Sequence, residues 1–420
     1  MIIIQGVVLI VSIKIYIGIL FVLSTLLWPV WIIGTLFVAG VLFFFLPIKG
    51  KFKLRYEKPG FRYDERDTIF SRLELTHRPE LQESYYRENP DKREKDKIWQ
   101  ERPGLMSEES TYYSPFTFAA ADASFDTIEK LRPFADGEIN SKQKNINPKK
   151  TTDFISKWGK RMGAVSIGFC RMEDYHFYSV RGRGEAYGKA VDSEHGYGIA
   201  LTVEMDEEFL ATGPAGPTLM ESARQYLNSG TIAIQIAHFL RGLGYSARAH
   251  IDGNYEVICP LVARDAGLGE LGRMGLLITP KLGPRVRIAV ITTDFPVEIS
   301  PRKPDYSVHD FCNRCMKCAN VCPAQAIPKE EIALINGVER WQINHEKCFG
   351  YWCTTGTDCG RCMSVCPYAH KNNWFHNFIR WGIRNNIYFR RIAVVLDDVF
   401  YGKKPESRQV PDWVKVYNDS

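Results

Sequence analysis

The sequence predicts three parts in order: an apolar N-terminal segment that enters a membrane, an α/β domain, and a cysteine-rich domain. Three observations support this. No charged side chain interrupts residues 15–47, helical and strand-like apolar patterns alternate from about residue 151, and nine of the eleven cysteines lie between Cys312 and Cys366. With 45% hydrophobic residues over 420 positions, the chain can bury large cores, which excludes a disordered protein.

The apolar run is longer than one membrane span requires. As a helix it would extend about 50 Å, whereas the hydrocarbon core is about 30 Å thick. We therefore expect residues 1–47 to form transmembrane helices with two spans, near Val7–Leu27 and Trp31–Leu46, interrupted at the proline of Trp28-Pro29-Val30. Because Lys14 would then lie inside the first span, one long tilted span is the alternative.

Positive side chains follow the apolar run directly, at Lys49, Lys51, Lys53, Arg55 and Lys58. Because Lys and Arg are retained on the cytoplasmic side, we expect a cell-membrane (inner-membrane) protein whose remaining parts face the cytoplasm, with the lipid bilayer as a partner. A cleaved secretory signal is disfavoured, since the run far exceeds an h-region and no small-residue cleavage site follows it. Lys+Arg (54) and Asp+Glu (48) are interleaved, and no basic stripe indicates nucleic acid.

Residues 48–150 are polar and mixed in charge, and we predict a loop-rich arm there. Residues 151–305 alternate between helical and strand patterns. We expect helices over 154–162 and 219–244, and strands over 163–168, 197–203, 275–279 and 286–292. This alternation predicts an α/β or α+β domain.

Two cysteine groups dominate residues 306–372. The first has the spacing C-x2-C-x2-C-x3-C-P, in which three thiolates hold one [4Fe–4S] cluster and the fourth ligates the other cluster. Crossing the fourth cysteines of the two groups predicts both ligand sets. Cluster 1 receives Cys312, Cys315, Cys318 and Cys366, and cluster 2 receives Cys322, Cys359 and Cys362 with either Cys348 or Cys353.

Other interpretations of the cysteines fit less well. A zinc site uses thiolates in pairs, whereas these are runs of cysteines followed by proline. Disulfides are disfavoured in a reducing cytoplasm. The isolated Cys170 and Cys259 are expected to be small buried apolar residues. Neighbouring clusters move single electrons and need an acceptor, for which the preceding residues are the place to look.

Residues 267–272, GLGELG, match the G-x-G-x-x-G pattern of dinucleotide sites. That pattern should follow a strand directly and open a helix. Here Arg264 and Asp265 precede the glycines and strand-like residues follow them. A dinucleotide site is therefore disfavoured, and a glycine-rich turn is the simpler alternative.

The same segment resembles the corrinoid-binding half of reductive dehalogenases. The similarity is carried by residues 266–275 (AGLGELGRMG), 283–287 (GPRVR), 241–245 (RGLGY) and 359–362 (CGRC), and it extends over roughly residues 150–402. It implies a nitroreductase-like α/β domain that holds a base-off cobalamin, followed by a ferredoxin-like domain with two [4Fe–4S] clusters. Family spacing selects Cys348 for cluster 2 and leaves Cys353 as a spare. The implied cofactor-binding residues are Gly267, Leu268, Gly269, Gly272, Arg273 and Gly275.

The resemblance also implies an activity, that of a corrinoid-dependent reductive dehalogenase removing halide from a small organohalide at a Co(I) corrinoid. Family positions match Tyr226 as the proton donor, Arg287 as a cation lowering its pKa, and Asn254 as a neighbour. A core tyrosine, an ordinary ion pair and a turn residue are the respective alternatives. No reductase domain is fused, so we expect an external electron donor: a ferredoxin, a flavodoxin or a quinol-linked protein.

Two other functions stay open from the sequence. Epoxyqueuosine reductase, a tRNA-modifying enzyme, shares the two-cluster corrinoid architecture, and a membrane-bound electron-transfer protein without its own substrate would also explain the cysteines. Residues 373–420 are predicted to form a C-terminal helical extension. Its basic, aromatic part over 373–395 either packs on the body or lies on a membrane surface.

Overall fold

A four-stranded antiparallel sheet is the centre of the α/β domain in this computed structural model, which describes residues 2–192 and 194–415. The strands are β1 Ser166–Arg171, β2 Tyr197–Glu204, β6 Val286–Thr293 and β3 Ala247–His250, in the order β1-β2-β6-β3. Strands β2 and β6 pair along their whole length, from Tyr197 opposite Thr293 to Glu204 opposite Val286. Both are rich in β-branched residues, which pack well on a pleated surface.

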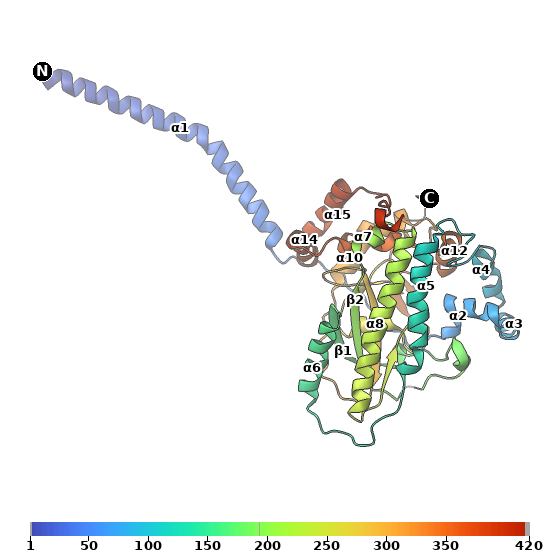
Figure 1. Ribbon diagram of the computed structural model, residues 1–420. Helices are drawn as coiled ribbons and strands as arrows, with labels where there is room; N and C mark the ends of the chain where they lie inside the picture. Colours follow the sequence, from blue (N-terminus) through green and yellow to red (C-terminus); the bar gives the residue numbers. More distant parts are fainter. Residues whose placement is uncertain (1, 193, 416–420) are drawn as a thin grey trace.

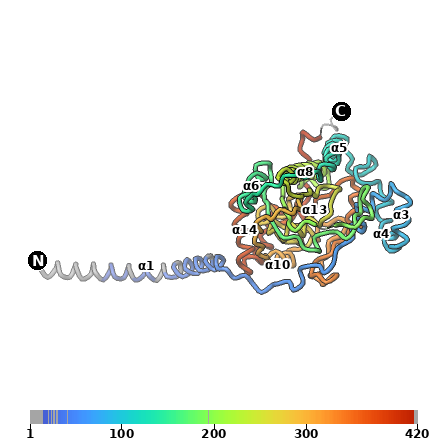
Figure 2. The backbone as a smooth tube through the Cα atoms, turned by 90° about the horizontal axis from the view of Figure 1, so that it is seen from below, coloured from blue at the N-terminus to red at the C-terminus, as the bar shows by residue number. Residues whose placement is uncertain are grey.

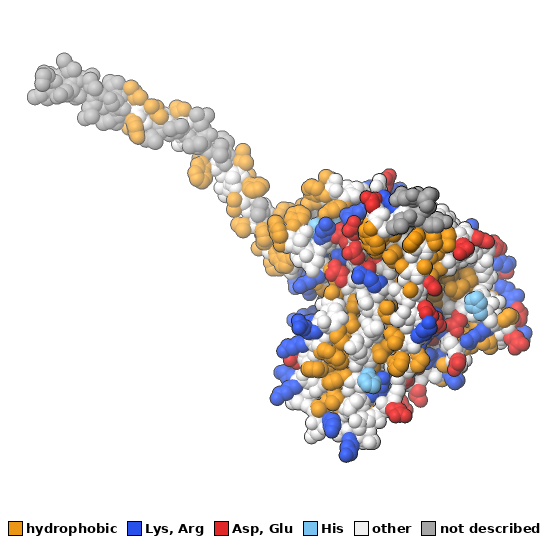
Figure 3. All heavy atoms as spheres, in the orientation of Figure 1, with side chains coloured by type: hydrophobic (Ala, Val, Ile, Leu, Met, Phe, Trp, Pro, Cys, Tyr) orange, Lys and Arg blue, Asp and Glu red, His pale blue; other side chains and the backbone are white. Residues whose placement is uncertain are grey.

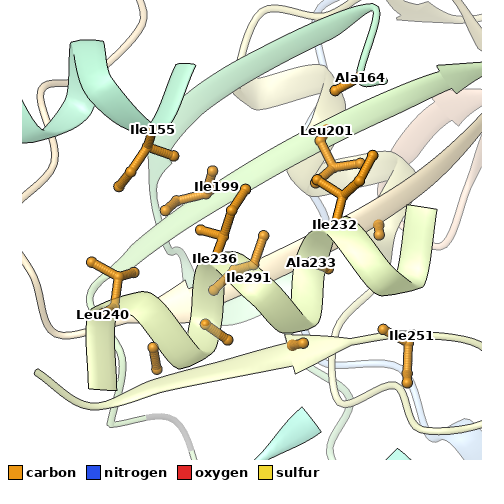
Figure 4. Close-up of a cluster of buried hydrophobic side chains, with 14 of the residues drawn as sticks. Ile155, Ala164, Ile199, Leu201, Ile232, Ala233, Ile236, Leu240, Ile251 and Ile291 are labelled. Carbon is orange, nitrogen blue, oxygen red and sulfur yellow. The ribbon is translucent and has the colours of Figure 1, made fainter. Parts of the chain in front are cut away.

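Helices cover both faces of this sheet (Figure 1). Alternate residues of β2 point to opposite faces, as a strand requires. Ile199 and Leu201 pack on α6 Pro148–Arg161 and α8 Gly216–Gly242, as Figure 4 shows. Ala200 faces α9 Cys259–Asp265 on the other side.

Several predicted elements are confirmed. Strands β2 and β6 and helix α8 lie within a few residues of their predicted bounds. Strand β1 begins three residues after its predicted start, because Gly163, at φ 114°, forms the turn after α6. The strand expected over 275–279 is only β5 Leu277–Ile278, which pairs with β4 Glu270–Leu271.

The prediction of a loop-rich arm over residues 48–150 is wrong, because four helices lie there. They are α2 Ile69–Glu74, α3 Pro79–Glu88, α4 Pro90–Gln100 and α5 Pro115–Lys130. Three of them begin at a proline. Proline is a good first residue of a helix, but in a sequence alone it indicates a turn or the end of a helix. Their apolar faces are narrow, since α4 buries only Asp96 and Trp99.

The cysteine-rich part is built from short helices and one hairpin. Its elements are α10 Tyr306–Cys315, α11 Lys317–Val321, β7 Ala333–Ile335, β8 Val338–Arg340, α12 His345–Thr355 and α13 Arg361–Ser364. Two helices follow, α14 Trp374–Asn385 and α15 Ile387–Tyr401. Figure 2 shows α13 in the middle of the body, with α3 and α4 at the end opposite to α1.

The N-terminal helix α1, Ile2–Phe45, projects from the body and bends part-way along (Figure 1). The interruption expected at Trp28-Pro29-Val30 is therefore wrong for the backbone, since a proline can bend a helix without ending it. The predicted spans fall partly on side chains outside the described set, namely those before Lys14 and at positions 20, 23, 25–27, 29, 30 and 41. Among the described residues, no helix combines the length and hydropathy of a membrane span.

A buried ion pair ties the arm to the cysteine-rich part. Arg72 on α2 donates from Nε to Asp96 Oδ2 on α4 at 2.8 Å, and from Nη2 to Glu346 Oε1 on α12 at 2.8 Å. Both Arg72 and Asp96 are fully buried. Asp96 also accepts hydrogen bonds from Tyr86 Oη and Trp99 Nε1, both at 2.9 Å.

Removing Asp96 should take one of two carboxylates from the buried Arg72 and leave Tyr86 Oη and Trp99 Nε1 without this acceptor. We expect Asp96→Ala to lower the free energy of unfolding by about 3–5 kcal/mol. The control is Glu83→Ala, whose exposed pair with Arg93 should contribute about 1 kcal/mol or less. Chemical denaturation measures both values, and equal stabilities for the two variants would contradict this account of the arm.

Candidate active site

Eight cysteines gather in two groups that do not follow their order in the chain. Cys366 belongs to the later sequence group, yet it lies with Cys312, Cys315 and Cys318. Burial, followed by these three thiols, raises the pKa of Cys366 well above its ordinary value. We call these four residues the first thiol group.

The second thiol group comprises Cys322, Cys348, Cys359 and Cys362. Burial raises the pKa of Cys362 well above its ordinary value, with Cys359, Cys348 and Cys322 among the contributing neighbours. Burial raises the pKa of Cys359 to about 12, and Cys348 and Cys322 add to this shift. The fourth cysteines are thus exchanged between the two groups, as the spacing predicts.

The structure separates the two candidates on α12. Cys348 lies beside Cys322. Burial, followed by this neighbouring thiol, raises the pKa of Cys348 to about 12. Cys353 is buried in an apolar cluster with Ile69, Trp99 and Phe349. Burial raises the pKa of Cys353 to about 11, with no other thiol contributing. Cys348, and not Cys353, therefore completes the second thiol group.

All eleven cysteines lie in the described part of the chain, and each is a free thiol. Cys170 and Cys259 are buried in the apolar cluster around α9, which confirms their interpretation as small core residues. Within the described residues, no three His, Cys, Asp or Glu side chains converge as a single metal ion would require.

A cavity of about 880 Å³ lies against the second thiol group, whose four members all line it. Its other walls include the arm near Tyr63, α9 at Arg264, the segment after α9 near Gly272, α10 at His309, the β7–β8 hairpin near Arg340, and β6 at Arg287. The first thiol group does not border it. The volume is at the upper end for small-molecule and cofactor sites, roughly 300–1,000 Å³.

Several buried polar atoms on the cavity wall have no hydrogen-bond partner: Tyr63 Oη, Arg287 Nε, His309 Nδ1, Arg340 Nε and Asp358 Oδ1. Burial lowers the pKa of His309 to about 4, so its ring is neutral at pH 7. Buried polar groups in native proteins are nearly always paired. Their number around one cavity indicates that the cavity receives a ligand with several polar groups.

Two of the six predicted cofactor-binding residues line the cavity, and the other four do not. Only Gly272 and Gly275 line the cavity, while Gly267, Leu268, Gly269 and Arg273 lie away from it. A Cβ on Gly269 would lie 2.4 Å from the carbonyl oxygen of Ile278, so close strand packing requires glycine there.

Arg273 has a packing role, which corrects its assignment to the cofactor. Its fully buried guanidinium donates to the backbone carbonyls of Cys312 at 3.1 Å and of Pro328 and Glu330 at 2.7 Å each. It also lies 4.8 Å above the ring of Trp341. This side chain therefore bonds the α/β domain to the cysteine-rich part.

Tyr226 and Arg287 meet, as the resemblance implies. The guanidinium carbon of Arg287 lies 4.4 Å from the ring centroid of Tyr226. Arg287 donates to Ser222 Oγ and, at 3.1 Å, to Asp358 Oδ2. Asp358 immediately precedes Cys359, so this ion pair links the tyrosine to the second thiol group.

The expected direction of the pKa shift of Tyr226 is wrong. Arg287 lowers this pKa, but burial and the carboxylates Asp252 and Asp358 raise it by more, so the net shift is upward. The phenol therefore stays protonated at neutral pH. Tyr226 is not itself among the residues that line the cavity, whereas its neighbours Arg287 and Asp358 are.

Asn254 does not join this group. Its side-chain oxygen accepts from Arg181 at 2.9 Å and from Arg248 at 2.8 Å, and the residue lies in a turn. Its neighbour Tyr255 instead lies near Tyr226, which after burial and Asp252 contributes to raising the pKa of Tyr255. The loose alignment of this loop accounts for the misplaced assignment.

Sequence reasoning missed three residues of this site: Asp358, Ser222 and Tyr255. Asp358 carried a usable signal, because a carboxylate next to a buried thiol needs a cation as partner. Ser222 lies four residues before Tyr226, on the same face of α8, which the helical repeat could have shown. Tyr255 had no signal in the sequence.

Comparison with known proteins gives a consistent result. The model of a 4Fe-4S dicluster domain matches residues 311–370. Tetrachloroethene reductive dehalogenase of Sulfurospirillum multivorans is 33% identical over 223 residues, covering 51% of this chain and 44% of that protein. The Desulfitobacterium hafniense enzyme of the same name is 39% identical over 194 residues, covering 43% of this chain and 34% of that protein.

A solved structure of the catabolic reductive dehalogenase NpRdhA, in complex with 3-bromo-4-hydroxybenzoic acid, aligns with a TM-score of 0.62 at 29% identity. The alignment covers 67% of this chain and 42% of that chain. The matched segments thus cover less than half the length of these relatives. Over the part that it shares with them, the chain is similar to reductive dehalogenases, and its residues 311–370 match a 4Fe-4S dicluster domain.

Proposed function

We propose that this protein is a reductive dehalogenase that removes halide from a small organohalide, using two [4Fe–4S] clusters and a base-off cobalamin. One observation carries the proposal: a single cavity borders a complete group of four thiols, several unpartnered polar atoms, and Arg287, which lies over Tyr226. We also infer a nitroreductase-like layout for the domain around the sheet.

The two thiol groups would hold the clusters, the first group cluster 1 and the second group cluster 2. When bound, such clusters transfer single electrons. Only the second thiol group borders the cavity, so its residues form the exit side of the electron path. An external ferredoxin, flavodoxin or quinol-linked donor would deliver electrons on the side of the first thiol group.

The cavity wall has the chemistry that a corrinoid requires. Gly272 and Gly275 would present backbone to a bound corrinoid, and Tyr63, His309 and Arg340 would hold its polar side arms. When bound, a reduced corrinoid supplies the electrons that cleave a carbon–halogen bond. The aromatic side chains of Tyr178 and Trp352 add apolar surface suited to an organohalide.

Replacing a halide by hydrogen consumes two electrons and one proton, and the chain must supply the proton. We assign this to Tyr226 Oη, whose raised pKa keeps it protonated. Arg287 would stabilise the phenolate that the transfer leaves behind, because it lies over the ring. Ser222 and Asp358 hold the guanidinium in that position.

We further propose that the protein resides in the cell membrane with its body facing the cytoplasm. The proposal is supported by the uncharged run over residues 15–47 and by the basic residues that follow it. In α1, the described side chains of Leu36 and Phe37 are 66% and 71% exposed and would be stable in lipid.

Anaerobic reconstitution with corrinoid and a strong reductant, followed by a halide-release screen on aryl and alkenyl halides, tests the function. Release of halide with stoichiometric formation of the hydrogen-substituted product is the expected result. Retention of iron and corrinoid without halide release from any tested compound would contradict it.

The assignment of the fourth ligand of cluster 2 can be tested with two cysteines on one helix. We expect Cys348→Ser to reduce the iron content from about eight to about four atoms per chain, because one cubane loses a thiolate. Cys353→Ser, in its apolar cluster, should keep the wild-type iron content. The opposite pattern would exchange the two assignments.

The role of Tyr226 can be tested with Tyr226→Phe, which keeps the ring and removes the proton. We expect halide release to fall by about 10²–10⁴-fold, with iron and corrinoid contents unchanged. In the wild type the rate should hold through neutral pH and decline only at a pH above the ordinary pKa of a tyrosine, because the phenol must be protonated and its pKa is raised.

Tyr245→Phe is the matched control, since its hydroxyl donates only to the carbonyl of Lys144 at 2.9 Å on the exposed side of the domain. It should release halide at the wild-type rate. Full turnover by Tyr226→Phe with both cofactors retained would exclude the proton-donor role.

A further inference from the structure

Helix α15 has an apolar stripe that faces solvent. Its residues recur every three or four positions on one side of the helix, at Tyr388, Ile392, Val395, Leu396 and Val399. Val395 is 62% exposed and Val399 is 72% exposed. The opposite side is buried through Arg390, Ala393 and Asp397. The stripe is therefore outside the packed core of the body.

Helix α14 extends this apolar surface with aromatic side chains. Trp374 is 82% exposed, and Phe375 and Trp381 are also exposed. Its own buried residues, Arg380 and Ile383, lie elsewhere on the helix. We call the exposed apolar sides of α14 and α15 together the aromatic platform.

The platform is continuous with the end of α1. The ring of Phe43 lies 5.2 Å from that of Tyr388, and the ring of Phe45 lies 5.7 Å from that of Trp381. Asn386 Nδ2 donates to the carbonyls of Phe43 at 3.0 Å and Leu46 at 3.1 Å. Figure 3 shows hydrophobic side chains gathered where α1 meets the body.

Basic side chains surround this apolar surface. Arg391 on α15 is exposed beside the stripe, and Lys371, Lys403 and Lys404 are exposed just before α14 and just after α15. Asp397, an acidic residue of α15, points inward to Lys317 and His370. Apolar and aromatic side chains flanked by Lys and Arg are typical of helices that lie in the interface of a bilayer.

We propose that the aromatic platform lies flat on a lipid bilayer containing anionic lipids, beside the point where α1 leaves it. This inference rests on the proposed membrane anchor and adds a second, in-plane contact. A large exposed apolar patch needs a partner. Continuity with α1 and the basic flanks favour lipid over a protein surface.

The contact would fix the orientation of the body. Behind the platform, Asp397 pairs with Lys317, which directly precedes Cys318 of the first thiol group. The platform would thus hold the first thiol group on the membrane side of the body and leave the cavity further from the bilayer.

Lipid photocrosslinking from the full chain tests the proposal. p-Benzoylphenylalanine is placed separately at positions 399 on α15, 36 on α1 and 134 in the turn Arg132–Ala135, in vesicles of phosphatidylcholine and phosphatidylglycerol. Phe134 is the matched control, since it is 59% exposed on an element that packs against β3 and α8. Mass spectrometry then detects lipid adducts at each position.

We expect lipid adducts at positions 36 and 399 and no lipid adducts at position 134. Adducts at 36 without adducts at 399 would overturn the platform while leaving the anchor intact. Adducts at neither position would overturn both the platform and the proposed anchor. Equal adduct yields at positions 399 and 134 would also overturn the proposed platform contact, because contact with lipid would then be nonspecific. A protein crosslinked at 399 in native membranes without lipid adducts would assign the surface to a protein partner instead.

Discussion

The exchange of Cys322 and Cys366 between the two thiol groups is the constraint on which the rest of the structure depends. Each group needs a residue from the other end of the segment, so residues 312–366 must fold back on themselves. Buried arginines hold this fold against the sheet domain. Arg273 donates to the carbonyl of Cys312. Arg285 donates to the carbonyls of Ala369 and Met205, each at 2.6 Å.

The cavity is a consequence of this docking, because its walls come from both sides of the junction and from the arm. On one side lie β6 and the glycines after α9, and on the other the second thiol group and Asp358. The ion pair of Arg287 with Asp358 crosses the junction and lies over Tyr226. In the proposed function, electron transfer and proton supply would thereby be directed to one place, which is what reductive removal of a halide requires.

Much of this arrangement could be predicted from the sequence, since spacing and periodicity are local signals. The thiol groups, strands β2 and β6, and α8 follow from cysteine spacing and apolar repeats. The helices of the arm could not, because tertiary contacts such as those of Asp96 with Arg72 and Tyr86 stabilise them. In the site, the choice between Asn254 and Tyr255 depended on the path of one loop. The upward shift of the pKa of Tyr226 depended on its burial and on carboxylates distant in sequence.

The central claim is that two thiolate-bound clusters deliver electrons to a corrinoid in one chain. Redox-controlled EPR spectroscopy of the anaerobic, corrinoid-reconstituted protein tests it most directly. The account predicts the signals of two magnetically interacting reduced cubane clusters and, at higher potential, the signal of a cob(II)alamin without a nitrogen axial ligand. Cubane signals from a preparation that binds no corrinoid would contradict it and leave a protein that only carries electrons.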